Sequence, residues 1–174
     1  MTRREDGFTL IELLIVVAII SVIAAIAVPG LLRARMTGNE TSAIGSLRVT
    51  SSSQVMYSAS CGNGAFAASY AVLGAPPAAG GEGFISADLG GSTTPSKSGY
   101  NFTLGGDTGS TAGANDCNGT ATITAWYATG VPQTIGTTGT RGFAVNAGNT
   151  IWQDTSGAAP TTPFTASATV TPIQ

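Results

Sequence analysis

The feature that most constrains this chain is a long apolar segment near its beginning. From Phe8 to Val28 the sequence reads FTLIELLIVVAIISVIAAIAV, with only Thr9, Glu12 and Ser21 as polar interruptions. As an α-helix this segment would be about 31 Å long, which matches the hydrocarbon core of a bilayer. A helix that is apolar on every side requires a membrane or a fully buried position. We therefore expect residues 8–28 to span a membrane.

Glu12 is the anomaly in this segment. A carboxylate at the centre of a span costs about 2.5–3.5 kcal/mol on insertion scales, and less near an end. On one interpretation Glu12 reaches the headgroups and has no role. On the other it has a functional partner, because a buried carboxylate is costly unless it is paired. We favour the second interpretation, because intramembrane acids are usually functional.

An ordinary secretory signal is a rival interpretation of the same segment. Arg3 and Arg4 would form its positively charged region, and Ala25-Ile26-Ala27 fits the A-x-A cleavage pattern. The apolar run, however, exceeds the usual signal-peptide core of about 7–15 residues. Glu12 would also lie inside that core. We therefore expect a span rather than a conventional signal.

The composition excludes several classes of function. The chain has 174 residues, enough for one domain, and only 9% of them are charged. Histidine is absent, which removes histidine-dependent catalysis and histidine metal ligands. The net charge of −2 leaves no basic face for nucleic acid, and Cys61 and Cys117 form no CxxC motif. We expect no enzyme activity, no cofactor, no metal and no small-molecule substrate.

The remaining sequence predicts an α+β fold. Pro29 bends or breaks a helix, and apolar positions then continue at roughly helical spacing through Leu47 and Val55. We interpret residues 29–60 as the second half of one long N-terminal helix, packed on a head. Two separate helices broken at Pro29 are the alternative.

Residues 61–154 are expected to form the globular head. The Gly-, Ala- and Pro-rich residues 61–98 predict a loop with one short helical turn. Alternating apolar and polar residues predict strands at 100–104, 120–127, 141–146 and 150–154. These strands would make a small antiparallel sheet of three or four strands packed on the helix. For the Thr- and Pro-rich tail at 155–174, disorder, packing along the head and glycosylation all stay open.

The residues around the start of the apolar run resemble a known processing site. Gly7-Phe8-Thr9-Leu10-Ile11-Glu12, followed by the run, is similar to the prepilin site of type IV pilins and their type II secretion pseudopilin relatives. The resemblance implies the pilin fold and a leader at residues 1–7. It also implies cleavage between Gly7 and Phe8 by a membrane peptidase, followed by N-methylation of Phe8. Pro29 falls where many such pilins have a helix-bending proline.

The same resemblance implies partners and a location. Residues 8–28 would hold the precursor in the bacterial inner membrane and later form the core of a helical homopolymer. Glu12 would then form an intersubunit salt bridge with the N-terminal amine of a neighbouring Phe8. Prepilin peptidase and the pilus assembly machinery would act on the chain. The head would be periplasmic and then extracellular, as part of a surface pilus.

Cys61 and Cys117 are predicted to form a disulfide in that oxidising compartment. The closed loop would contribute about 4 kcal/mol in the chain-entropy model. Two unpaired buried thiols are the alternative. Many pilins have a disulfide near the C-terminus, whereas this pair would open earlier in the chain and leave a longer tail beyond it.

The leading hypothesis is a structural subunit of a type IV pilus that serves adhesion, twitching motility or DNA uptake. One subunit does not distinguish these uses, so a nucleic-acid partner stays open. A type II secretion pseudopilin and a minor pilin are close alternatives. An alternative of another class is a single-span anchored binding protein that never polymerises. Such an inert anchor should tolerate Glu12→Ala, whereas an assembling pilin should not.

Overall fold

The structure is a computed structural model, and it describes residues 7–173. Apart from Gly7, the predicted leader therefore lies outside the described residues. The chain divides into two compact units, Met1–Arg35 and Met36–Gln174. Helix α1 (Leu10–Ser60) contributes to both units. We call the described residues of the second unit, 36–173, the head.

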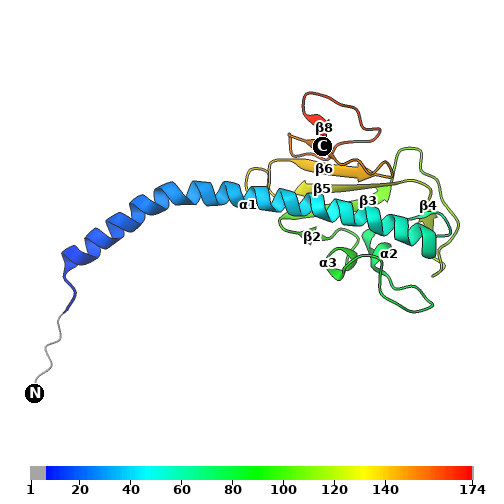
Figure 1. The fold of residues 1–174 in the computed structure, drawn as a ribbon, viewed down its shortest axis with the longest axis horizontal. Helices are drawn as coiled ribbons and strands as arrows, with labels where there is room; N and C mark the ends of the chain where they lie inside the picture. The colour runs from blue at the N-terminus through cyan, green and yellow to red at the C-terminus, as the bar shows by residue number, and fades with distance from the viewer. Residues whose placement is uncertain (1–6, 174) are drawn as a thin grey trace, which may run out of the picture. The chain divides into compact units, whose positions relative to one another are not determined.

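Helix α1 is continuous through Pro29 (Figure 1). The structure therefore has one long helix here rather than two helices separated at this residue. An interior proline removes one backbone hydrogen bond of a helix. The bend that we predict at Pro29 stays a prediction.

In the first unit, the helix is exposed along its whole described length. Every described residue from Gly7 to Arg35 is exposed, and the exposed fractions of Phe8 and Ile26 are 84% and 78%. A window of 18 residues in α1 has a mean hydropathy of 3.0, and none of it is buried. By length and composition this helix could cross a membrane.

The head contains the C-terminal part of α1 and two antiparallel sheets. Within the described residues, the larger sheet has six strands in the order β2-β3-β5-β6-β7-β8. These strands are β2 (Ser96–Lys97), β3 (Tyr100–Gly106), β5 (Trp126–Pro132), β6 (Gly142–Asn146), β7 (Trp152–Asp154) and β8 (Val170–Pro172). The smaller sheet pairs β1 (Phe66–Ala67) with β4 (Thr122–Ile123). The expected α+β class, a long N-terminal helix packed on antiparallel sheet, is confirmed.

The larger sheet exceeds the three or four strands predicted from the sequence. The strand expected at 120–127 is divided between β4 and β5, and β5 continues through Gly130 to Pro132. Gly130 lies inside the strand, and the absence of a side chain there leaves room for the ring of Phe102. A Cβ there would lie 3.0 Å from Cε1 of Phe102. Glycine in a strand often marks such a close approach.

The region between the helix and the sheet is also more structured than predicted. In place of one helical turn, residues 61–98 contain α2 (Tyr70–Gly74) and α3 (Ala87–Gly90), in addition to β1 and β2. The hydroxyl of Ser69 accepts a hydrogen bond from the amide of Val72 and so caps α2. Tyr70, Leu73 and Leu89 are buried and attach both short helices to the core.

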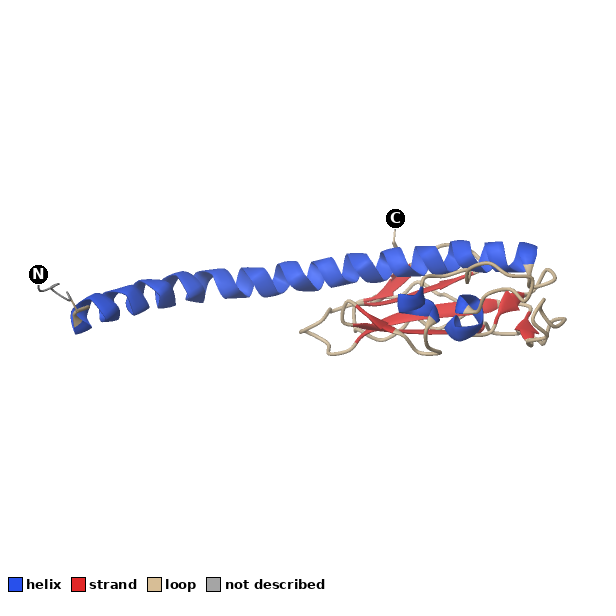
Figure 2. Ribbon diagram, turned by 90° about the horizontal axis from the view of Figure 1, so that it is seen from below, coloured by secondary structure: helices blue, strands red, loops and turns tan. Residues whose placement is uncertain are grey.

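Within the head, the C-terminal part of α1 lies along one face of the larger sheet (Figure 2). From β3, the alternate residues Tyr100, Phe102 and Leu104 are buried in the core. The helix contributes a largely polar face to the head. Its buried residues are Glu40, Ala43, Ser46, Leu47, Thr50, Ser51, Ser53, Gln54 and Tyr57.

The buried polar groups of this helix face have partners in the head. The Thr50 hydroxyl lies 3.0 Å from the hydroxyl of Tyr70. The Gln54 amide donates to the carbonyl of Ala67 and accepts from its amide, both at 2.9 Å. Among the described residues that are not exposed, no buried side-chain nitrogen or oxygen lacks a hydrogen-bond partner. This matters because an unpaired buried polar group would cost about 1–3 kcal/mol.

The segment predicted as a tail packs on the opposite face of the sheet. The ring of Phe164 stacks on Trp152 at 5.3 Å between centroids and contacts Tyr127 at 6.1 Å. Further along, Val170 pairs with Asp154, so this segment supplies the edge strand β8. Of the three options that the sequence left open, packing along the head describes the structure.

Candidate functional site

The residues predicted for processing and assembly lie at the start of α1. Gly7 and Phe8 precede the helix, Thr9 is the residue immediately before it, and Glu12 lies in its first turn. The predicted cleavage point between Gly7 and Phe8 is thus in an exposed, non-helical segment. The predicted salt bridge between Glu12 and Phe8 joins two copies of the chain, and the structure contains one copy.

Thr9 and Glu12 form a reciprocal cap on the helix. The Thr9 amide donates to Oε2 of Glu12 at 2.9 Å, and the Thr9 hydroxyl donates to the same oxygen at 2.6 Å. In return, the Glu12 amide donates to the Thr9 hydroxyl at 3.4 Å. This is the capping-box arrangement, in which Ser or Thr precedes the helix and Glu or Gln follows three residues later.

The cap leaves one oxygen of Glu12 available. Oε1 accepts no hydrogen bond from the described residues, whereas Oε2 accepts two from Thr9. Cleavage after Gly7 would convert the Phe8 amide into a charged amine and leave the Thr9 amide intact. The capping box is therefore compatible with both the precursor and a processed chain. Sequence reasoning missed the role of Thr9, although the Thr-x-x-Glu spacing is the sequence pattern of a capping box.

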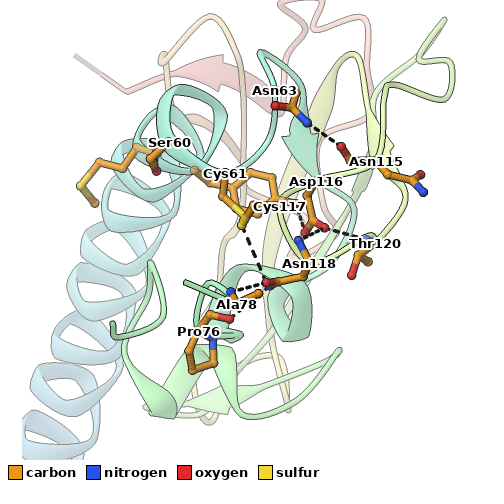
Figure 3. Close-up of a disulfide and its surroundings, with 12 residues drawn as sticks. Ser60, Cys61, Asn63, Pro76, Ala78, Asn115, Asp116, Cys117, Asn118 and Thr120 are labelled. Atoms are coloured by element: carbon orange, nitrogen blue, oxygen red, sulfur yellow. Dashed lines mark hydrogen bonds between the residues drawn. A yellow bond between two sulfur atoms is a disulfide. The ribbon is translucent and has the colours of Figure 1, made fainter. Parts of the chain in front are cut away.

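Cys61 and Cys117 are joined by a disulfide, with Cα atoms 4.8 Å apart (Figure 3). Cys61 directly follows α1, and its carbonyl accepts a hydrogen bond from the Cys117 amide at 2.8 Å. Asn118, the next residue, accepts from the Ala78 amide at 2.6 Å and donates to the Pro76 carbonyl at 3.2 Å. The disulfide thus connects the end of the helix with the segment between β3 and β4, and Asn118 binds that segment to the loop between α2 and α3.

The neighbouring Asp116 organises the segment around the disulfide. One carboxylate oxygen accepts from the amides of Asn118 and Thr120, and the other accepts from the Tyr57 hydroxyl at 2.7 Å. Burial alone would raise the pKa of Asp116, but these hydrogen bonds outweigh burial and hold the pKa below its usual value. Burial and the adjacent carboxylate both raise the pKa of Tyr57.

A second charged cluster joins α1 to the sheet. Glu40 of α1 is 5% exposed, and its Oε2 accepts from Nε and Nη2 of Arg141 at 2.9 and 2.6 Å. Its Oε1 accepts from the amide and hydroxyl of Thr140 at 2.8 and 2.9 Å. Arg141 also donates to Gln153 of β7 at 2.6 Å. We call Glu40, Thr140, Arg141 and Gln153 the helix clamp.

The helix clamp keeps a buried carboxylate ionised. Burial raises the pKa of Glu40, but the hydrogen bonds from Thr140 and Arg141 together lower it below its usual value. Both guanidinium donors reach the same oxygen, Oε2, and such charge-assisted hydrogen bonds are stronger than neutral ones. The sequence analysis did not identify this cluster, since its partners lie about a hundred residues apart in the chain.

Comparisons with known proteins bear on the N-terminal segment. Residues 2–28 match a family model described as the prokaryotic N-terminal methylation motif. Over 39 residues, the chain is 59% identical to the type IV wide pilus major component PilA4 of Thermus thermophilus. That match covers 22% of this chain and 30% of the relative, so most of both chains lies outside it. No solved structure matches this chain. The predicted resemblance to type IV pilins is thereby confirmed.

Proposed function

We propose that this protein is a structural subunit that polymerises into a type IV pilus filament at a bacterial surface. The observation that carries the proposal is the apolar half of α1, which is exposed at every described position before residue 36 and lies mostly within the matched methylation motif. Such a surface is stable only when something else covers it. The membrane covers it in the precursor, and other copies of the chain cover it in the filament.

Burial of apolar area favours both the membrane-inserted precursor and the filament over a subunit whose apolar segment faces water. Each square ångström of apolar surface removed from water contributes about 25 cal/mol. Leucine, isoleucine and valine fill most of the segment from Leu10 to Val28, so their transfer from lipid into a bundle of like helices keeps them away from water. The head carries its own core and a disulfide, and it remains in solvent in this proposal.

Glu12 would set the register of assembly. When Gly7 is removed, the new amine of Phe8 on a neighbouring copy supplies the positive charge that a buried carboxylate requires. Oε1 of Glu12 is the atom that this amine would reach, because Oε2 already accepts from Thr9. A copy placed in the wrong register would bury an unpaired charge.

Prepilin peptidase would cleave after Gly7 and methylate Phe8, and the assembly machinery would extract the subunit from the inner membrane. The finished filament would be extracellular and would serve adhesion, twitching motility or DNA uptake. Measurements of attachment, surface movement and transformation in a deletion strain would assign its use.

Three variants separate the charge of Glu12 from its capping role. Glu12→Ala removes both, Glu12→Gln removes the charge but retains a capping residue, and Thr9→Ala removes the cap but retains the charge. The measurement is the yield and regularity of filaments in sheared surface material, by immunoblotting and electron microscopy. The amount of each chain in the membrane fraction is the control.

We expect both Glu12 variants to lose normal filaments while membrane levels are maintained, and Thr9→Ala to retain filaments. Wild-type yield and regularity from Glu12→Gln would refute the salt bridge. A wild-type chain that never leaves the envelope would indicate a pseudopilin or a minor pilin. A chain that forms no assemblies in either fraction would be a single-span anchored binding protein.

A further inference from the structure

The head carries one cation and one anion without an internal partner. Among its described residues the cations are Arg48, Lys97 and Arg141, and the last two form ion pairs with Asp88 and Glu40. Five of its acids accept hydrogen bonds or ion pairs, namely Glu40, Asp88, Asp107, Asp116 and Asp154. Arg48 and Glu82 are both exposed, and neither side chain makes an ion pair or a hydrogen bond with residues 7–173.

Arg48 lies at a groove beside α1. The groove has a volume of about 480 Å³ and runs between the exposed side of the helix and the segment that joins β6 to β7. Val55, Val145 and Ile151 supply apolar wall, and Asn149 lies at the turn. Val55 is 56% exposed and available to a partner, whereas Val145 and Ile151 are buried and form the floor of the groove. The groove therefore combines an apolar surface with a positive charge.

Glu82 lies on a protruding loop whose negative charge and small apolar residues complement the Arg48 groove. Residues 76–83 read PPAAGGEG, a run of small and apolar residues with one acid. Most of the loop is exposed, and Gly80 and Gly81 have φ angles of 95° and 125°, which favour glycine. The loop is nevertheless anchored, because Asn118 binds it at Pro76 and Ala78 (Figure 3).

The loop and the groove are on opposite sides of the helix within the head. Helix α3, which follows the loop, contacts β2 at one end of the strand order. The groove is lined from β6 and the approach to β7, toward the other end of that order. Figure 1 shows α2 and α3 on one side of this part of α1, and β6 and β8 on the other.

We propose that the loop at 76–83 of one copy occupies the Arg48 groove of the next copy, with Glu82 paired to Arg48. This inference rests on the proposed filament function and adds a specific contact between heads. A contact between two different patches is heterologous, so two joined copies still leave one loop and one groove free for further copies. A small, open contact of this kind would set the direction and register of neighbouring heads.

Charge reversal in the full-length chain tests the pairing. The variants are Arg48→Glu, Glu82→Lys and the double reversal. The control is Thr93→Lys, at an exposed position between α3 and β2 on the same side of the head. The readout is sheared filament yield, with thermal unfolding and membrane levels measured for every variant. We expect each single reversal to lower the yield by about tenfold, because a like-charge contact is unfavourable. The double variant should return to within about twofold of wild type, and Thr93→Lys should match wild type.

Co-expression of the two single variants separates a contact between copies from one within a chain. Alternating copies would present opposite charges at every contact, so filaments should return only if the pair joins two copies. Normal filaments from both single variants would overturn the contact and leave the filament function intact. Failure of both the double variant and co-expression to restore the yield would also overturn the contact. Absence of filaments from the wild-type chain would overturn the function and, with it, this contact.

Discussion

Removal of the Glu40 carboxylate should destabilise the head more than any surface charge change. The Glu40 side chain is 7% exposed and accepts hydrogen bonds from Thr140 and Arg141. Glu40→Gln would present an NH₂ group to donors that now face an oxygen. Breaking a buried ion pair costs about 3–5 kcal/mol. We expect the lower end, about 3 kcal/mol, because the Arg141 side chain is 34% exposed and can regain water.

This loss is measurable as a change in melting temperature. For a unit of this size, each kcal/mol corresponds to about 2–4 °C, so Glu40→Gln should melt about 6–12 °C below wild type. Both tryptophans, Trp126 and Trp152, lie in strands of the head. Their fluorescence in the full-length chain in detergent therefore follows the head rather than the apolar half of α1.

The matched control is the exposed pair of Asp88 and Lys97, whose side chains are 46% and 35% exposed. Asp88→Asn should cost less than about 1 kcal/mol, because exposed ion pairs contribute little. If Glu40→Gln lowered the melting temperature no more than Asp88→Asn, the helix clamp would not stabilise the head as we argue.

The same variant tests how the contribution of the helix clamp to stability depends on pH. Because the pKa of Glu40 is lowered in the folded chain, its contribution is fully present above its usual value of 4.5 and is lost as the pH falls through the lowered value. The difference in melting temperature between wild type and Glu40→Gln should therefore shrink on acidification. A difference that grows at low pH would contradict this assignment.

Three further predictions concern the head. Replacing both Cys61 and Cys117 with serine should lower the free energy of unfolding by about 4 kcal/mol, and a reductant should then have no further effect in thermal unfolding. Gly130→Val should cost about 1–3 kcal/mol by crowding the Phe102 ring; an unchanged melting temperature would contradict the close packing. Phe164→Ala should expose the chain after β7 to protease, with cuts mapped by mass spectrometry; cleavage at the wild-type rate would contradict its attachment.

The processing and assembly residues at the start of α1 could be predicted because their sequence signals are local. The apolar run, Gly7, Phe8 and Glu12 are contiguous, so the resemblance required no knowledge of the fold. Thr9 belongs to the same local pattern and could have been assigned as the helix cap from its spacing to Glu12.

The head could be predicted only in outline, because polar residues form its helix face. Val55 was expected at the packed spacing, yet it is 56% exposed, whereas Thr50 and Gln54 are fully buried. Their partners, Tyr70 and Ala67, come from another part of the chain, so neither is visible as a periodic apolar pattern. Helical periodicity identifies buried apolar positions, not buried hydrogen-bonded ones.

The end of β5 and the whole of β8 were missed for similar reasons. Residues 128–132 contain Gly130 and Pro132, which are usually read as breaks, although Gly130 accommodates an aromatic ring within β5. Strand β8 comes from a Thr- and Pro-rich segment whose pairing with β7 depends on a neighbour that sequence alone does not reveal.

The most direct test of the central claim is mass spectrometry of the N-terminal peptide in sheared surface material, compared with the envelope fraction. A filament subunit should give an abundant sheared chain that begins at methylated Phe8. Detection of that terminus in the envelope alone would contradict a surface pilus and favour a pseudopilin or minor pilin. A chain that begins at Val28, or that retains Met1 or Thr2 at its start, would contradict prepilin processing and with it the proposed filament core.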